Sequence, residues 1–499
     1  MTDPLPRLSR RGALAALALT AGCAPRIEPA SSGLRLPALF SRAPATAAPP
    51  ATMAWPDAAW WREFGAPPLD ALMRAAMAGN LDLAAASARV RQADAQVRIS
   101  GASLLPSVDG DLSAGRSRSG NRNPGSAAQA GNSFGATVSA SYEVDFWGRN
   151  RAALEAARSS ATAARYAVGV TALSTQSAVA NALFSLLGAR EQLEIQRGNL
   201  EVATRNLGIL RSRIAAGTAT GLDVAQQETV VAQQRAAIPP LQLTADQNAL
   251  ALGTLTGTIP GDMVVETLRI GAIRVPEVPA GLPSEVLARR PDVQLAEANL
   301  LTANANVAAA RAALFPTIAL TARGGVSATA LDLLLRPGST LYSLAAGLTA
   351  PIFDGGALRA QVDQFRARRE ELLANYQQAI LAALEDTEAS LAALRWNTEL
   401  VELQRARVAA AQRAYDIAEA QLRAGTVDLL TVLSVQTSLF SARTALAQAQ
   451  TGRLQAAAAL FTALGGGWSL DAAAATPSPG GGPDGGPWGG PNAGGSPSP

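Results

Sequence analysis

Few side chains in this 499-residue sequence are of the types that carry out chemistry. Histidine is absent, which removes Ser-His-Asp triads, HExxH zinc sites and most proton shuttles. Cys23 is the only cysteine, so there is no internal disulfide, CxxC pair or four-cysteine metal site. The net charge of +3 gives no indication of nucleic-acid binding. We therefore expect no enzyme activity, no metal and no dissociable cofactor.

Two carboxylates beside two glycines are the remaining polar candidates. The stretches "IAAGTATGLDVA" (214–225) and "LRAGTVDLLTVL" (422–433) share a Gly-Thr pair, and Gly217 and Gly425 are 208 positions apart. Each glycine interrupts a long run with helical periodicity, so we expect it to form a left-handed turn between two helices. Asp223 and Asp428 follow these turns, where acidic side chains can cap the returning helices.

The cysteine follows a sequence typical of an export signal. Arg7, Arg10 and Arg11 precede the apolar stretch "GALAALALTAGC", which is too short to span a bilayer. We predict a lipoprotein signal over residues 1–22, with acyl chains attached to Cys23 as the first mature residue. An ordinary signal peptide that contains a cysteine is the alternative. The paired arginines leave Sec and twin-arginine export both open.

The body of the chain is an internal duplication. Landmarks recur at offsets of 207 to 210 residues, namely Pro106 with Pro316, Gly148 with Gly355, and Gly217 with Gly425. The expected organisation is a lipidated Pro/Ala-rich tether over 23–54, a first repeat over 55–268, a second repeat over 269–468, and a disordered Gly/Pro-rich tail over 469–499.

Each repeat contains two stretches in which apolar and polar residues alternate. We expect strands at about 103–115, 133–146, 314–325 and 341–353, joined by loops over 116–132 and 325–340. Each has about the length of a tilted membrane strand. Along the second, Phe134, Val138 and Tyr142 share one parity and Thr137 and Ser139 the other. A soluble sandwich fits less well, because only four long strands are available.

Four strands cannot close a barrel, and open sheet edges are not tolerated in lipid. Copies of the chain must therefore combine their strands. A dimer would give eight strands around a plugged interior, and a trimer would give twelve strands that can enclose a water-filled lumen. The polar-parity acids favour a wet lumen; they are Asp109, Asp111, Glu143 and Asp145.

Long helices follow each strand pair. No proline occurs between Gly148 and Ile238, and after Pro351 none occurs until Pro477. Apolar residues recur at steps of three and four, as in a coiled coil or a helical bundle. The stretch from Gly148 to Gly217 corresponds to about 100 Å of helix, long enough to cross a compartment.

The sequence resembles the TolC-type outer-membrane efflux proteins, closest to their lipoprotein branch in RND-type tripartite systems. The similar stretches are 60–96, "RRPDVQLAEANLLTANANVAAARAALFP" (289–316), "RAGTVDLLTVLSVQTSLFSARTALAQAQ" (423–450) and "LFTALGGGW" (460–468). The resemblance implies a mainly α-helical homotrimer whose twelve-stranded membrane β-barrel continues into a long α-helical barrel. It also implies a location in the outer membrane of a Gram-negative bacterium, anchored by lipid and extending through the periplasm.

Several functions fit this resemblance. Passive export of drugs or other small molecules is the leading one, with a periplasmic adaptor protein and an inner-membrane RND-type pump as partners. A channel for type I protein secretion is the alternative within the same class. A lipid-anchored structural coiled-coil protein without a pore is a third interpretation, but it gives no reason for two duplicated strand pairs.

The resemblance also gives the glycine turns a role. In the family such turns form the closed periplasmic mouth, held by charged side chains just past the glycine. Carried over, the candidate gate residues are Asp223, Asp428, Leu430, Thr431 and Ser434. This sequence departs from the pattern, because Val427 stands where some relatives carry arginine and Thr431 and Ser434 stand where acids often occur. Three interpretations stay open: rings of Asp223 and Asp428 that bind cations, an apolar constriction at Leu430, and simple helix capping.

Overall fold

The computed structural model describes residues 32–35, 37, 39–42, 58–119, 129–261, 265–276, 283–466 and 468. Cys23, most of the expected tether and the tail 469–499 lie outside these residues, so the predictions for them stay predictions. The first elements in chain order are η2 (Trp60–Phe64), α2 (Pro67–Gly79), α3 (Leu81–Ala102), β1 (Ser107–Ser119), β2 (Gln129–Val144), α4 (Arg149–Ala215), α5 (Gly221–Ala236), α6 (Ile238–Thr256) and η3 (Ile270–Ala272). They are followed by α7 (Pro283–Arg289), α8 (Pro291–Ala312), β3 (Thr317–Ala328), η4 (Leu331–Leu333), η5 (Pro337–Ser339), β4 (Thr340–Thr349), α9 (Ala357–Arg423) and α10 (Leu429–Ala463).

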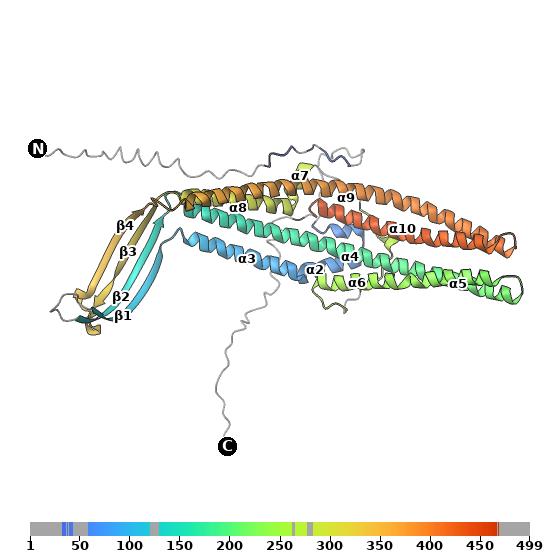
Figure 1. Ribbon diagram of the computed structural model, residues 1–499, viewed down its shortest axis with the longest axis horizontal. Coiled ribbons are helices and arrows are strands. Elements are labelled where there is room, and N and C mark those ends of the chain that lie inside the picture. The colour runs from blue at the N-terminus through green and yellow to red at the C-terminus, as the bar shows by residue number, and fades with distance from the viewer. Residues whose placement is uncertain are drawn as a thin grey trace, which may run out of the picture. The chain divides into compact units, whose positions relative to one another are not determined.

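The element order repeats once along the chain (Figure 1). The series α3, β1, β2 and α4 of the first half corresponds to α8, β3, β4 and α9 of the second. The predicted order of helix, strand pair and long helix in each half is therefore confirmed. The chain divides into two compact units: unit 1 comprises residues 1–36, 88–167 and 292–383, and unit 2 comprises 37–87, 168–291 and 384–499.

The two long helices, α4 and α9, have 67 residues each, which corresponds to about 100 Å at 1.5 Å per residue. Both run without proline, the residue that would break the backbone hydrogen-bond ladder. One 18-residue window of α4 is apolar enough to cross a bilayer by composition, but 56% of it is buried inside the protein. We attribute this apolar character to packing against neighbouring helices.

Unit 1 contains a four-stranded antiparallel sheet in the order β1-β2-β3-β4. The register runs without interruption in all three pairs, from Ser107 opposite Ser141 to Val326 opposite Thr340. Because strand residues alternate between faces, the register shows which side chains share a face. One face, here called the apolar face, carries the rows Val108–Ala140–Ala322–Leu344, Tyr142–Leu320–Ala346 and Val144–Ile318–Leu348. The polar face carries the rows Asp109–Ser139–Arg323–Ser343 and Ser107–Ser141–Thr321–Ala345.

The apolar face is exposed in the single chain. Leu112 is 87% exposed, Leu344 is 83% exposed and Val138 is 57% exposed. The sheet also has two open edges, because β1 and β4 each pair with one neighbour only. Exposed apolar strands with open edges are unfavourable in water, so this sheet requires another environment or further strands.

The strand ends differ from the predicted ones for identifiable reasons. Leu104, predicted in the first strand, lies in the turn that ends α3, where its N–H donates to Gly101 at 3.1 Å. Phe146 and Ile352, predicted in the second and fourth strands, lie beyond Val144 and Thr349. In each case the chain has already turned toward the following long helix. Conversely, β1 and β2 extend into the predicted loop 116–132, because ladder pairing such as Arg116 with Asn132 does not require apolar side chains.

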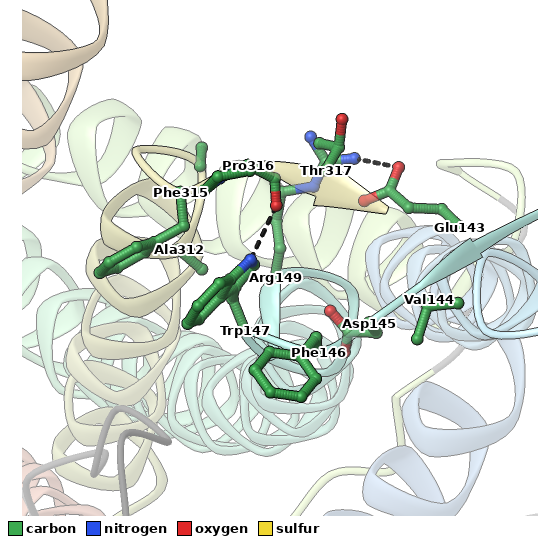
Figure 2. A pocket seen from close by; sticks show the side chains of 11 residues that line it. Glu143, Val144, Asp145, Phe146, Trp147, Arg149, Ala312, Phe315, Pro316 and Thr317 are labelled. Atoms are coloured by element: carbon green, nitrogen blue, oxygen red, sulfur yellow. Dashed lines mark hydrogen bonds and ion pairs between the residues drawn. The ribbon is translucent and has the colours of Figure 1, made fainter. Parts of the chain in front are cut away.

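The junction between the sheet and the helices in unit 1 is held by polar and aromatic contacts (Figure 2). The indole Nε1 of Trp147 donates to the Pro316 carbonyl at 2.7 Å, and its ring stacks on Phe315 with centroids 4.7 Å apart. Arg149 pairs with Glu143 at 2.7 Å. Asp145 accepts the N–H groups of Asn150 and Arg151 at 2.9 Å each, which caps the first turn of α4.

The core of unit 2 joins the start of the body to its end. Trp60 and Phe64 of η2 are fully buried, and Trp60 stacks on Phe461 of α10 with centroids 5.0 Å apart. Phe184 of α4 completes the aromatic cluster, with its ring centroid 5.4 Å from that of Phe64. The stretches at 60–96 and 460–468, which are far apart in the sequence, therefore both contribute aromatic side chains to one buried cluster.

The returning helices of the two halves differ. After the first turn the chain forms α5 and α6, which meet at Ala237, whereas after the second turn it forms one 35-residue helix, α10. Pro239 and Pro240 lie in the first turn of α6, where proline starts a helix but ends the one before it. The sequence predicted a single returning helix in each half, and the first is instead interrupted.

Candidate functional site

The candidate site comprises the turns of two helix hairpins, α4–α5 and α9–α10 (Figure 1). The turns contain Gly217 and Gly425 and belong to unit 2. Gly217 has φ of 71° and Gly425 has φ of 74°, in the left-handed region. The N–H of Gly217 donates to Ile214 at 2.9 Å and that of Thr218 to Arg213 at 2.9 Å. This pair of bonds is a Schellman motif, which satisfies the last carbonyl groups of α4.

The second turn repeats the first in detail. The N–H of Gly425 donates to Leu422 at 3.1 Å and that of Thr426 to Gln421 at 3.0 Å. The Thr426 hydroxyl also donates to the Gln421 carbonyl at 3.2 Å, as the Thr218 hydroxyl does to Arg213. The shared Gly-Thr pair therefore encodes one turn geometry twice: glycine adopts the left-handed conformation and threonine closes the end of the helix.

Asp223 lies in the first turn of α5 and forms a capping box with Thr220. The Thr220 N–H and hydroxyl donate to Asp223 Oδ2 at 2.7 and 2.8 Å, and the Asp223 N–H donates to Thr220 Oγ1 at 3.3 Å. The two bonds from Thr220, the backbone one first, lower the pKa of Asp223 below its ordinary value. Asp223 is thus an ionised residue that stabilises the start of a helix.

Asp428 occupies a different place in its own turn. It is the N-cap of α10, and its Oδ1 accepts the Thr431 N–H at 2.9 Å. The hydroxyl and the N–H of Thr431 both hydrogen-bond the carboxylate and lower the pKa of Asp428. The capping interpretation of both acids therefore has direct geometric support, and it accounts for Thr431 as the partner of Asp428.

One hydrogen bond between the two hairpins lies close to their turns. Arg213, at the end of α4, donates from Nη2 to the Leu422 carbonyl near the end of α9 at 3.3 Å. Nothing in the spacing of the sequence distinguishes Arg213 from the other arginines of α4. Asp223 and Asp428 are bonded each within its own hairpin, and in the described part of the chain no hydrogen bond or ion pair joins them.

The remaining gate candidates lie on the surface of α10. Leu430 is 63% exposed, and Thr431 and Ser434 are also exposed. Leu222, which occupies the matching position after the first turn, is 66% exposed. The two hairpins therefore each carry, at an equivalent place, an apolar side chain that the single chain leaves uncovered. Thr220 was missed as a site residue, although the T-x-x-D spacing before a helix is a known capping signal.

Packing behind the turns holds the hairpins in place. In the α9–α10 hairpin, Tyr415, Val432 and Leu439 form a buried cluster that also includes Val202 of α4 at its margin. In the α4–α5 hairpin, Ala203, Leu207 and Val231 form a second one. The buried Gln227 side chain donates to the Ala203 carbonyl at 2.7 Å. The turns are therefore carried on packed helix pairs.

The electrostatic chemistry of this site is limited to charge and hydrogen bonding. Within the residues that the structure describes, no group of three or more His, Cys, Asp or Glu side chains could hold a metal ion. Arg211 and Glu228 form an exposed ion pair across the first hairpin at 2.9 Å. Exposed charged side chains of this kind can attract ions or bind the polar surface of another protein.

Comparison with known proteins decides the family. A family model described as outer membrane efflux protein matches residues 72–258 and 282–466. The chain belongs to the outer membrane efflux protein family. The pyoverdine export outer membrane protein OpmQ of Pseudomonas aeruginosa is 44% identical over 419 residues, which are 83% of this chain and 88% of that protein. The toluene efflux pump outer membrane protein TtgC of Pseudomonas putida is 34% identical over 425 residues, covering 84% and 87%.

Solved structures of outer-membrane channels show the same fold as this efflux protein. OprN superposes with a TM-score of 0.82 at 27% identity, over 89% of this chain and all of that one. The open-state MtrE channel of Neisseria gonorrhoeae superposes with a TM-score of 0.79 at 27% identity, over 89% and 98%. The chain is an outer-membrane efflux channel protein with the TolC fold, as the sequence analysis predicted.

Proposed function

We propose that three copies of this efflux protein combine their sheets into a twelve-stranded barrel in the outer membrane. The single observation that carries the proposal is the sheet of unit 1, which has one exposed apolar face, one polar face and two open edges. Closure of the edges satisfies every strand hydrogen bond, and lipid covers the apolar face. Three sheets of four strands give a barrel wide enough for a water-filled lumen lined by the polar face.

We propose that the duct is a passive channel and that an inner-membrane RND-type pump, joined to it through a periplasmic adaptor, drives export. The 67-residue lengths of α4 and α9 support this assignment, because helices of about 100 Å reach far from the bilayer. The hairpin turns at their ends are the natural contact points. Affinity capture of the full chain, with the co-purified membrane proteins then identified, tests the partners.

Small molecules are the proposed cargo, and a pyoverdine-type siderophore is the first candidate. The two OpmQ relatives, at 44% and 40% identity, are named for pyoverdine export, whereas the relatives named for toluene or solvent efflux are 34% identical. Expression of the chain in a Pseudomonas strain that lacks its own outer-membrane protein for pyoverdine export should restore the secretion of pyoverdine. Restoration of solvent tolerance alone would favour toluene-like solvents as the cargo. Restoration of neither pyoverdine secretion nor solvent tolerance would contradict small-molecule export through this chain.

We further propose that Cys23 carries the lipid. Acyl chains contribute about 0.8 kcal/mol of membrane affinity per buried methylene group. Cys23→Ser should abolish incorporation of labelled palmitate, while the barrel keeps the protein in the outer-membrane fraction. Unchanged labelling of the variant would exclude Cys23 as the attachment site.

For the turns we propose that Asp223 and Asp428 act both as caps and as charged rings at the periplasmic mouth. Three copies about one axis would bring like charges together, which binds cations and opposes anions. Asparagine keeps the acceptor oxygen of a cap and removes the charge. The double variant Asp223→Asn/Asp428→Asn should therefore fold normally and lose cation selectivity in planar bilayers. Unchanged selectivity would leave capping as the only role and make Leu430 the next residue to test.

A further inference from the structure

Two arginines continue the apolar face of β1 beyond its apolar residues. The pairing of β1 with β2 runs without a bulge from Ser107 opposite Ser141 to Ser119 opposite Gln129. Alternate residues therefore stay on one face throughout. Arg116 and Arg118 share the face of Val108 and Leu112. Both arginines are exposed.

The length of the apolar band places these arginines at its edge. On the same face of β2, the residues from Phe134 to Val144 are apolar or aromatic at every alternate position, a span of eleven residues. A tilted strand needs about 9–11 residues to cross a bilayer. Arg116 pairs with Asn132, the next position on this face beyond Phe134, and Arg118 pairs with Ala130. The arginines therefore lie at the level expected for lipid headgroups.

Within the residues that the structure describes, no carboxylate neutralises the positive charge at this edge. On the apolar face of β1 and β2 no side chain is a carboxylate, because Asp109 and Asp111 have the opposite parity. The segment 116–132 contains three arginines and no acidic residue. Neither Arg116 nor Arg118 forms an ion pair with any residue in the described part of the chain. Two positions along a strand separate them by about 7 Å.

We propose that Arg116 and Arg118, with the amide of Asn132, bind the phosphate groups of phosphorylated lipids in the outer leaflet. Guanidinium groups bind phosphate oxygens through paired, charge-assisted hydrogen bonds. The assignment rests on the proposed function, in which the helices extend into the periplasm and the β1–β2 connection lies at the outer surface. Lipid phosphates would then neutralise the arginines at the bilayer edge.

The sheet itself offers two controls. Arg323 has the opposite parity, on the polar face, where it pairs with Ser139 and Ser343. Arg323→Gln therefore removes one positive charge from the sheet without touching the proposed lipid site. The exchange Arg116→Ser/Ser117→Arg keeps the charge at the same height but moves it to the polar face.

The test uses the purified full chain in non-ionic detergent and counts bound lipid by native mass spectrometry. The probes are lipid A with two phosphates, dephosphorylated lipid A, and inorganic phosphate as a competitor. A basic side chain near an anionic lipid surface contributes about fivefold in affinity, so Arg116→Gln/Arg118→Gln should bind diphosphorylated lipid A roughly 30-fold more weakly. The exchange variant should lose about fivefold, and Arg323→Gln should bind like the parent.

Equal binding of diphosphorylated and dephosphorylated lipid A by the parent chain would overturn the proposal. So would equal binding by the parent and the double variant, which would leave the arginines as solvated charges. Displacement of the lipid by millimolar inorganic phosphate would show that the arginines take free phosphate in preference to a lipid, which would also overturn the proposal. The same spectra report the number of chains, so a parent that forms no three-chain complex would contradict the proposed function separately from the lipid site.

Discussion

Thr220 and Asp428 occupy the same place in two helix turns 208 positions apart. Each is the N-cap whose side chain accepts the N–H three residues further on, from Asp223 at 3.3 Å and from Thr431 at 2.9 Å. The residue types are exchanged between the halves, with Thr then Asp in the first and Asp then Thr in the second. Duplication has thus kept the geometry of the cap while its carboxylate changed position.

This relationship predicts the effect of removing the first cap. Thr220→Ala deletes the acceptor for the Asp223 N–H and should cost about 1 kcal/mol of stability at the start of α5. Thr220→Ser keeps the hydroxyl and should cost only a few tenths of a kcal/mol. Hydrogen exchange at the amides of residues 221–226 measures the difference. Equal protection in the alanine variant and the parent would show that the box contributes nothing to this turn.

The pH dependence of the turns follows from the two carboxylates. Their folded-state pKa values lie below the ordinary value of 3.8, because hydrogen bonds from Thr220 and Thr431 favour the ionised forms. Their stabilising contribution is therefore present above pH 3.8 and is lost as the pH falls through the lowered values. Exchange at the first turns of α5 and α10 should accelerate in acid, corrected for intrinsic rates. The variants Asp223→Asn and Asp428→Asn should not show this acceleration, and a variant that did would place the titrating group elsewhere.

The turn glycines give a matched pair of opposite effects. Gly425 has φ of 74° and no atom near the position of an added Cβ, so Gly425→Ala should cost about 1–2 kcal/mol from backbone conformation alone. Gly221 is also open to a Cβ but lies in the first turn of α5 without a positive φ. Gly221→Ala should therefore stabilise the protein by about 0.4–1 kcal/mol. Thermal unfolding of the two variants measures both changes in stability. Changes of the same sign would contradict the assigned backbone conformations.

The sheet predicts damage that depends on strand parity. Val138→Arg places a charge on the apolar face and should cost about 2–4 kcal/mol near the bilayer midplane. Ser139→Arg, one residue along, places the same charge on the polar face and should be tolerated. The yield of heat-modifiable trimers from outer membranes measures both. Equal losses from the two variants would show that the faces do not separate lipid from water.

The alternating strands and the long helices could be predicted from the sequence because their signals are periodic. Val138 and Ser139 are assigned to opposite faces by the alternation alone, and the proline-free run after Gly148 indicates a long helix. The ends of the strands could not be placed, since Leu104 and Phe146 continue the alternating pattern although Leu104 still lies in the turn after α3 and Phe146 lies beyond the end of β2.

The candidate site was predictable only where it is local in sequence. Gly217 and Gly425 were identified because a glycine inside a long helical run commonly marks the end of a helix. The bond from Arg213 to Leu422 could not be predicted, because it joins helices far apart in the sequence through a backbone carbonyl. The interruption between α5 and α6 has a visible signal in the sequence, because Pro239 and Pro240 end the proline-free run and cannot lie inside a continuous helix.

Labelling by an aqueous reagent distinguishes the water-facing side of β2 from its lipid-facing side. In a Cys23→Ser background, single cysteines at positions 138 and 139 on β2 would be exposed to a membrane-impermeant maleimide in intact outer-membrane vesicles. A barrel with a water-filled lumen predicts rapid labelling for Ser139→Cys and protection for Val138→Cys, which faces lipid. Equal labelling of the two positions would contradict the account that this sheet forms the wall of an outer-membrane channel.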